Sequence, residues 1–152
     1  MAKAITVCQP WAWAIIHGPK RVENRRWYTS YRGLLLIHTG KSRDWLFKGP
    51  RDWSSLYGIE FPNDEDLVFG AVIGSVDLVA CVSVQDARSG RLAKQWPWLA
   101  EHPFVEGPWC FVLQNPEPSP AYFCRGELGL WDTVRPRPTP GDGTSGVTRL
   151  YP

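Results

Sequence analysis

The chain has 152 residues, of which 43% are hydrophobic, so it can bury the core of one domain and has little room for a second. Residues 1–53 carry ten Lys or Arg and three acids, a net charge of +7, whereas the remainder carries seven Lys or Arg and twelve acids, or −5. This one-sided positive charge favours a polyanionic partner. The alternative is a solvated surface on which the charges segregate without function.

The sequence carries no pattern for export, membrane insertion or metal binding. Its first apolar run, residues 12–16, is too short for a signal-peptide core or a membrane span. The cysteines at positions 8, 81, 110 and 124 form no CxxC pair, so we predict no metal site and no cofactor. We therefore expect a reduced, cytoplasmic protein that has no contact with membranes.

The first predicted elements are a strand, a short helix and two further strands. Residues 4–8 are β-prone, and Pro10 suits the first turn of a helix that runs over residues 11–17. Residues 21–27 indicate a strand with polar side chains interleaved. Residues 34–38 are apolar on both faces, which predicts a central strand of the sheet.

The middle of the chain predicts two short helices and the longest strand. Ser42 can cap a helix that runs through Trp45, and Gly49-Pro50 interrupts it, so we expect two short helices or one broken helix. Residues 71–84 are the longest β-prone stretch, with Gly74 as a candidate bulge.

The last predicted strands are short. Residues 108–113 form one, closed by Asn115-Pro116, and two more follow at residues 122–124 and 128–131. Five to seven short strands, with the helices clustered early in the chain, indicate an α+β fold. Its core would be a small mixed β-barrel and not a parallel sheet of βαβ units.

The C-terminal residues differ in composition from the rest of the chain. From residue 133 on, the chain holds four prolines and three glycines and lacks a packing pattern. This composition predicts a domain of residues 1–132 followed by an extended or mobile tail of residues 133–152.

The segment Gly18-Pro19-Lys20-Arg21-Val22-Glu23-Asn24-Arg25-Arg26-Trp27 is the most informative for function. On a strand, Glu23 and Arg25 point to the same face, and the Gly-Pro bend turns Lys20 toward them. A Lys, a Glu and an Arg at one cleft mouth can hold a phosphate, orient a base edge or form an acid/base pair. The alternative is a solvated strand whose ion pairs contribute little.

Three further residues are candidates beside this segment. Gln9 and Trp11 lie at the predicted strand-to-helix corner near Lys20. Trp11 can stack on a base, a contact of about 1–3 kcal/mol, or can belong to the core. His38 ends an apolar strand and is either an acid/base group or a core histidine with satisfied hydrogen bonds.

Several stretches resemble ASCH domains. Residues 6–12, TVCQPWA, followed by Gly18-x-Lys20-x-x-Glu23-x-Arg25, are similar to the opening of that family, whose hallmark is GxKxxExR after a strand and a short helix. The likeness returns over residues 31–38, 107–113 and 125–131, and it covers about residues 4–132. The resemblance implies a PUA-like β-barrel with helices covering one opening, and a cleft linked to RNA or modified nucleosides.

The resemblance also bears on individual residues. Lys20, Glu23 and Arg25 fill the family's cleft positions. Some relatives are amidohydrolases that remove the acetyl group of N4-acetylcytidine, but they carry Thr where this chain has Glu23. Other relatives bind nucleic acid or cleave RNA.

We therefore expect a domain that binds RNA, a nucleotide or a nucleoside. Lys20, Arg25, Arg26 and Lys41 would contact phosphates, with Glu23 accepting from a base amino group. Single-stranded RNA is favoured, because its bases can splay into a cleft. One alternative is an enzyme, either an amidohydrolase in which Lys20 activates water beside Glu23, or a nuclease. Another is a protein-interaction module whose basic face docks an acidic partner.

Overall fold

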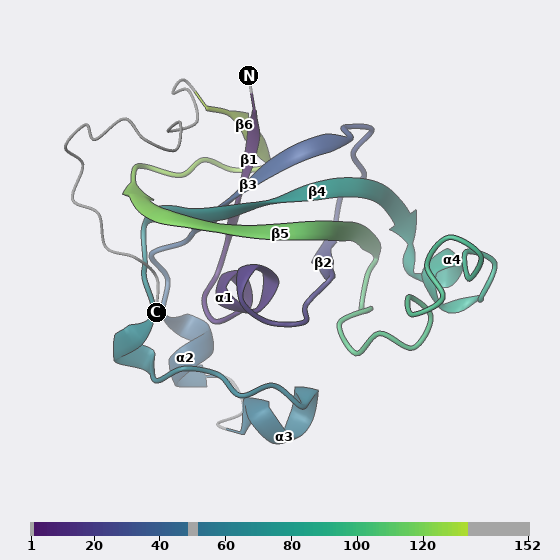
Figure 1. Ribbon diagram of the computed structural model, residues 1–152, viewed down its shortest axis with the longest axis horizontal. Helices are drawn as coiled ribbons and strands as arrows, with labels where there is room; N and C mark the ends of the chain where they lie inside the picture. Colours follow the sequence, from purple (N-terminus) through teal and green to yellow (C-terminus); the bar gives the residue numbers. More distant parts are fainter. Residues whose placement is uncertain (1, 49–51, 134–152) are drawn as a thin grey trace.

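The described residues, 2–48 and 52–133 of the computed structural model, form one mixed sheet with short helices around it (Figure 1). The hydrogen-bonded order of the six strands is β2-β5-β4-β3-β1-β6, and every neighbouring pair is antiparallel except β1 and β3. The strands are β1 (Lys3–Val7), β2 (Val22–Arg25), β3 (Gly33–Thr39), β4 (Ala71–Ser83), β5 (Trp109–Phe123) and β6 (Leu130–Asp132). The helices are α1 (Trp11–Ile16), α2 (Asp44–Lys48), α3 (Trp53–Tyr57), η1 (Asp64–Asp66) and α4 (Val84–Arg88).

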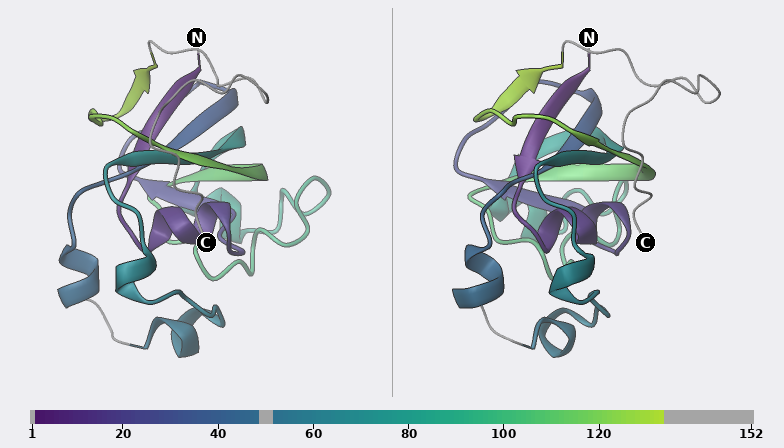
Figure 2. Two further views of the ribbon diagram at one scale, coloured as in Figure 1. Left: turned by 60° about the vertical axis from the view of Figure 1, so that its left-hand side comes forward. Right: turned by 90° about the vertical axis from the view of Figure 1, so that its left-hand side faces the viewer.

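The sheet curls into a partial barrel, which confirms the expected α+β fold built on a small mixed sheet. Figure 2 shows the strongly twisted sheet, with the segment that carries α2 and α3 on one side of the molecule. Helix α1 lies between the sheet and that segment. Helix α1 contacts β3, β4 and β5 and inserts Ile15 and Ile16 into the main core beside Ile73 and Phe111. All six residues of α1 are apolar, and burial against the sheet stabilises a helix that is too short to persist alone.

The predicted central strand is confirmed. Strand β3 lies between β4 and β1, with Leu35 and Ile37 fully buried and Leu36 partly buried. Its parallel pairing with β1 needs a crossover, and residues 8–32, which hold α1 and β2, provide it.

The predicted bulge at Gly74 is also confirmed. The registers of β4 with β3 and with β5 both shift between Val72 and Gly74. A Cβ at Gly74 would lie 2.5 Å from the carbonyl oxygen of Glu117 and 2.9 Å from Cδ1 of Ile16. Only glycine therefore allows β5 and α1 to approach β4 this closely.

The prediction that Asn115-Pro116 closes a strand is wrong. Strand β5 continues through them to Phe123, which also absorbs most of the strand expected at residues 122–124. Ser75 pairs with Glu117 and Asp77 with Gln114, so Asn115, with a φ of 51°, and Pro116 form a bulge. The prolines at 116, 118 and 120 alternate, so their missing N–H groups share one edge. The main-chain N–H of Leu113 donates to the carbonyl of Arg21 on this edge, and beyond it no described strand pairs with the edge, so the prolines leave no partner without a donor.

The other short elements agree with expectation, with small shifts of their ends. Helix α1 and the pair α2 and α3 lie where the sequence predicts them, and Ser42 accepts a hydrogen bond from the main chain of Asp44 at 3.2 Å. Among the described residues, no helix has the length and apolar character to cross a membrane.

Of the predicted tail, only Thr133 is described, and it donates to the carbonyl of Ala2. Residues 134–152 lie outside the described residues, so the domain boundary stays a prediction.

Candidate functional site

The structure brings Lys20, Glu23 and Arg25 together as the sequence predicts. The Nζ atom of Lys20 lies 3.3 Å from Oε1 of Glu23, and Nη2 of Arg25 lies 3.0 Å from Oε2. We call these three residues the seam cluster. Glu23 thus bridges two cations, and ionised hydrogen bonds of this kind are the stronger ones in proteins.

Local structure explains how the cluster forms. Glu23 and Arg25 alternate with Val22 and Asn24 on β2 and therefore share one face. The chain bends at Gly18-Pro19, and the main-chain N–H of Lys20 donates to the carbonyl of Ala14 at 3.1 Å. This bend places the Lys20 side chain beside Glu23.

Arg21 supports the bend, a role that the sequence analysis missed. Its Nη1 donates to the carbonyl oxygens of Ile15, Gly18 and Lys20 at 3.0–3.1 Å. A cation at the C-terminal end of a helix satisfies carbonyl groups that lack an intrahelical partner. The sequence contained an indication of this role, since Arg21 follows the predicted end of α1 by only four positions.

Arg25 also joins two distant parts of the sheet. Its Nη2 donates to the main-chain carbonyl of Thr6 on β1 at 2.8 Å. Strands β1 and β2 are separated by three others in the hydrogen-bonded order, so this bond spans the gap left by the curled sheet. We call this gap, between β2 and the β1–β6 end, the barrel seam.

Burial and charge in the seam cluster oppose each other. The side chains of Lys20, Glu23 and Arg25 are 3%, 12% and 23% exposed. Burial tends to raise the pKa of Glu23, but the charges of Lys20 and Arg25 outweigh it and hold this pKa below its usual range. Burial lowers the pKa of Lys20, and Glu23 opposes that shift by stabilising the ammonium form. Fully ionised, the cluster has a net charge of +1.

The described contacts leave part of the hydrogen-bonding capacity of the cluster unused. Oε1 of Glu23 accepts from Lys20 and from the main-chain N–H of Asn24 at 3.1 Å, whereas Oε2 accepts only from Arg25 among the described residues. Arg25 makes both of its described bonds through Nη2, so the donors on Nη1 and Nε have no partner within the described part of the chain. The cluster therefore offers an acceptor and several donors side by side.

Lys20 is engaged more completely than its neighbours. Its ammonium donates to the carbonyl of Val22 and to Glu23, and it lies 4.8 Å from the centre of the Phe104 ring.

Asn24, on the other face of β2, donates to the carbonyl of Phe104 at 2.8 Å and accepts from the main-chain N–H of Gly107 at 2.8 Å. The segment at residues 104–107 is therefore tied to β2, a link that no local pattern indicates.

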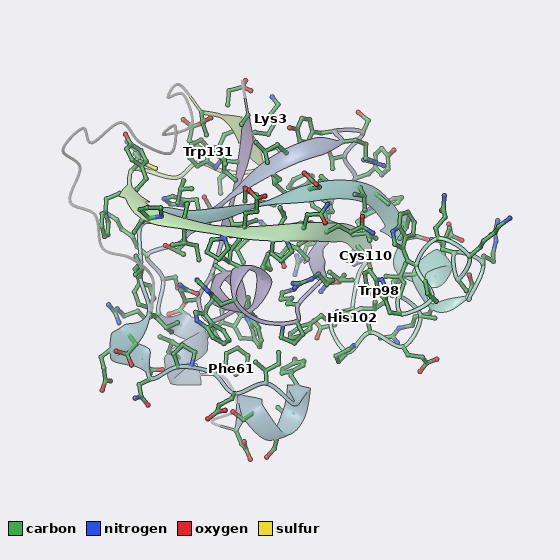
Figure 3. All side chains as sticks on the ribbon, viewed as in Figure 1. Lys3, Phe61, Trp98, His102, Cys110 and Trp131 are labelled. Carbon is green, nitrogen blue, oxygen red and sulfur yellow. The ribbon has the colours of Figure 1, made fainter. Side chains whose placement is uncertain are left out.

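Gln9 is buried in the fold, and Trp11 packs among aromatic side chains. Gln9 is fully buried, donating to the carbonyl of Val68 and accepting from the main-chain N–H of Trp13, both at 2.9 Å. Trp11 is partly buried and makes edge-to-face contacts, which agrees with its predicted core alternative. Its ring neighbours are Trp45, Tyr57, Phe61 and Phe104. Phe61 can be located in Figure 3 below α1.

His38 also takes the core alternative. It is 3% exposed, with Nε2 2.9 Å from the carbonyl of Cys124 and Nδ1 3.1 Å from the hydroxyl of Thr6. A carbonyl only accepts, so Nε2 carries the proton and Nδ1 accepts from Thr6. Burial lowers the pKa of His38, in keeping with a neutral ring.

Arg26 and Lys41 are exposed, as expected of residues that contact phosphates. Arg26 directly follows β2, and Lys41 follows β3. A Cβ at Gly70 would lie 3.2 Å from Cε of Lys41, so the lysine stem lies on that glycine. The Arg43 guanidinium stacks 4.0 Å above the Phe69 ring. Among the described residues, no group of three His, Cys, Asp or Glu could hold a metal ion.

Comparison with known proteins identifies the family. The ASCH domain family matches residues 5–119. The chain is 31% identical over 137 and 138 residues to Activating signal cointegrator 1 of Homo sapiens and of Mus musculus. These alignments cover 84% of this chain and 21% of each relative, so the chain spans about a fifth of their length. The solved ASCH structure from Zymomonas mobilis is 17% identical, with a TM-score of 0.44 over 80% of this chain and 73% of that one. On the match of the family over residues 5–119, the chain belongs to the ASCH domain family.

Proposed function

We propose that the chain binds single-stranded RNA, or a nucleotide, at the barrel seam through Glu23 and Arg25. The proposal rests on the hydrogen-bonding groups of the seam cluster that have no described partner. The ionised carboxylate of Glu23 can accept a further hydrogen bond, and it lies directly beside Arg25 donors that can donate one. A nucleotide presents the complementary groups, an amino group on the base edge and an anionic phosphate. Membership of the ASCH family, which is associated with RNA binding, supports the same ligand class.

Each residue has a distinct part in this proposal. Glu23 accepts from the exocyclic amino group of cytosine or adenine, and Arg25 donates to a phosphate. The exposed cations Arg26 and Lys41 contribute further phosphate contacts. Lys20 holds Glu23 charged and in place, because its own ammonium already faces Val22, Glu23 and Phe104.

The same contacts weigh against Lys20 as a general base. A lysine that activates water must be in its neutral form and must reach the water. Lys20 is 3% exposed and paired with Glu23, which stabilises its protonated form. The seam cluster therefore fits ligand binding better than amidohydrolase chemistry.

The test is binding of a short labelled single-stranded RNA, measured by fluorescence anisotropy at several salt concentrations. Counterion release predicts that log K falls linearly with log salt, with a slope of about −0.7 per phosphate contacted. The variant Glu23→Gln keeps the shape of the side chain and should weaken binding of cytidine- and adenosine-containing strands more than of uridine strands. No binding at low salt, or a flat salt response, would refute the proposal.

A second assay addresses the enzymatic alternative. Purified protein is incubated with N4-acetylcytidine, with Lys20→Ala and Glu23→Ala as controls. We expect no deacetylation. Turnover that is lost in both variants would replace the binding role with catalysis.

A further inference from the structure

An aromatic pair continues the seam cluster along β2 and β5. Trp109, the first residue of β5, pairs directly with Arg25 across the two strands. Tyr28, three residues beyond Arg25, packs against Trp109 with ring centres 5.1 Å apart and planes at 64°. Paired residues of antiparallel strands point to the same face, so Trp109 lies on the face that carries Glu23 and Arg25. We call Tyr28 and Trp109 the aromatic corner.

The two rings of the aromatic corner differ in how far solvent reaches them. Trp109 is partly buried against the main core, but Tyr28 is 52% exposed. Its ring therefore presents an open face to solvent beside the half-covered indole of Trp109.

The loop that carries Tyr28 is held by its own hydrogen bonds. The main-chain N–H of Tyr31 donates to the Thr29 hydroxyl at 3.1 Å, and the Tyr31 hydroxyl donates to the carbonyl of Leu34. Nη1 of Arg32 donates to the carbonyls of Thr29 and Tyr31 at 2.9 and 2.8 Å. A loop ordered in advance loses little conformational entropy when a ligand stacks on it.

The charges around the corner favour a nucleic acid over an apolar protein segment. Residues 24–32 contain three arginines and no acid. Arg26 and Arg32 are exposed on the same short segment as Tyr28, so phosphates on either side of a stacked base would meet cations. Aromatic rings interleaved with basic side chains are the arrangement with which proteins bind single strands.

We propose that the aromatic corner stacks the base next to the one held at Glu23 in a single-stranded RNA. This inference rests on the proposed function of the seam cluster. Tyr28 is three positions after Arg25 in the chain, so the Cα atoms of the two residues are at most about 11 Å apart. Arg25 lies between the two base sites and contacts the phosphate that joins the two nucleotides.

The test begins with the affinity of Tyr28 variants for a short single-stranded RNA. Removing a base-stacking ring typically weakens binding by about 5- to 150-fold, so Tyr28→Ala should show a loss in this range. The salt slope should stay the same, because no phosphate contact is removed. Tyr28→Phe keeps the ring and should bind like the wild type. Phe123→Ala is the matched control, since Phe123 is 51% exposed at the far end of β5 and should not matter.

An abasic scan then locates the base. With the wild type, one abasic position should weaken binding by a factor similar to that of Tyr28→Ala, and in that variant the same position should have no further effect. Equal binding by Tyr28→Ala and the wild type would overturn the inference and leave the seam cluster intact as an RNA site. An equal loss in Tyr28→Phe, or losses that add at every abasic position, would also overturn it. If the wild type binds no RNA, both proposals fail.

Discussion

Two polar clusters meet at Thr6, and they differ in what they leave open. On one side, the main-chain carbonyl of Thr6 accepts from Arg25 of the seam cluster. On the other, its hydroxyl bonds to His38, whose second ring nitrogen bonds to the carbonyl of Cys124. The His38 side is neutral and has a partner for each ring nitrogen. The seam side is charged and has unused acceptors and donors among its described contacts.

This difference separates a structural cluster from a candidate binding site. Lys20 and His38 are equally buried, at 3% exposure each. Burial alone therefore does not distinguish the two clusters. Charge and remaining hydrogen-bonding capacity do, because a ligand forms new hydrogen bonds only with polar groups that the fold has not already paired. Four predictions test the comparison, from the largest expected effect to the smallest.

The largest effect is expected for Lys20→Met. Methionine nearly matches the length of lysine but leaves the buried carboxylate of Glu23 with only one cation. Removing one member of a buried ion cluster typically costs about 3–5 kcal/mol of unfolding free energy, which urea denaturation can measure.

The matched control for this variant is Lys3→Met. Lys3 pairs with Asp132 at 2.8 Å, but the two side chains are 32% and 49% exposed. A surface pair contributes about 0–1 kcal/mol. Equal losses in the two variants would mean that the seam cluster behaves as an ordinary surface network.

A smaller loss of stability is expected for His38→Ala. The substitution leaves the Thr6 hydroxyl and the Cys124 carbonyl without the imidazole and opens a cavity, at a cost of about 2–3 kcal/mol. RNA affinity, measured by anisotropy well below the melting temperature, should not change. A selective loss of RNA binding in the folded variant would place His38 in the binding site. It would contradict the distinction between a structural His38 cluster and a ligand-binding seam cluster.

Gly126→Ala tests the packing of the His38 side. A Cβ at Gly126 would lie 2.5 Å from the Thr6 hydroxyl oxygen and 2.6 Å from Cε1 of His38. This overlap should lower the free energy of unfolding by about 1–3 kcal/mol. The control is Gly40→Ala, since a Cβ there would meet Thr6 at an ordinary 3.5 Å. Thermal melts in which Gly40→Ala loses as much as Gly126→Ala would contradict this account.

The smallest differences are expected in the pH dependence of stability. Both groups have folded pKa values below their usual ones, so each contributes stability that is lost as pH falls. The loss from His38 begins below about pH 6.5 and that from Glu23 below about pH 4.3, the values of the unfolded chain. Free energies of unfolding should show that His38→Gln removes part of the first slope and Glu23→Gln part of the second. Unchanged slopes in either variant would count against the assignment of that group.

Much of the seam cluster could be predicted because its geometry is local. The alternation of a strand places Glu23 and Arg25 on one face, and the Gly-Pro bend brings Lys20 to them, all within six residues. The central position of β3 and the bulge at Gly74 likewise follow from residue types in short windows. Sequence reasoning erred at Asn115-Pro116, where a turn signal marks a bulge, because the free edge of β5 tolerates proline.

The sequence by itself determined which side chains share a face, since the period of a strand or helix depends only on neighbouring residues. It also determined the family, through a motif of eight positions and the segments around it. Only the tertiary structure decided that Arg25 reaches Thr6 and lies opposite Trp109, 84 residues away. It also decided that Gln9 and His38 are buried and that Trp11 packs against both core clusters. These outcomes depend on which distant strands pair and how far the sheet curls, and the packing of the whole core sets both.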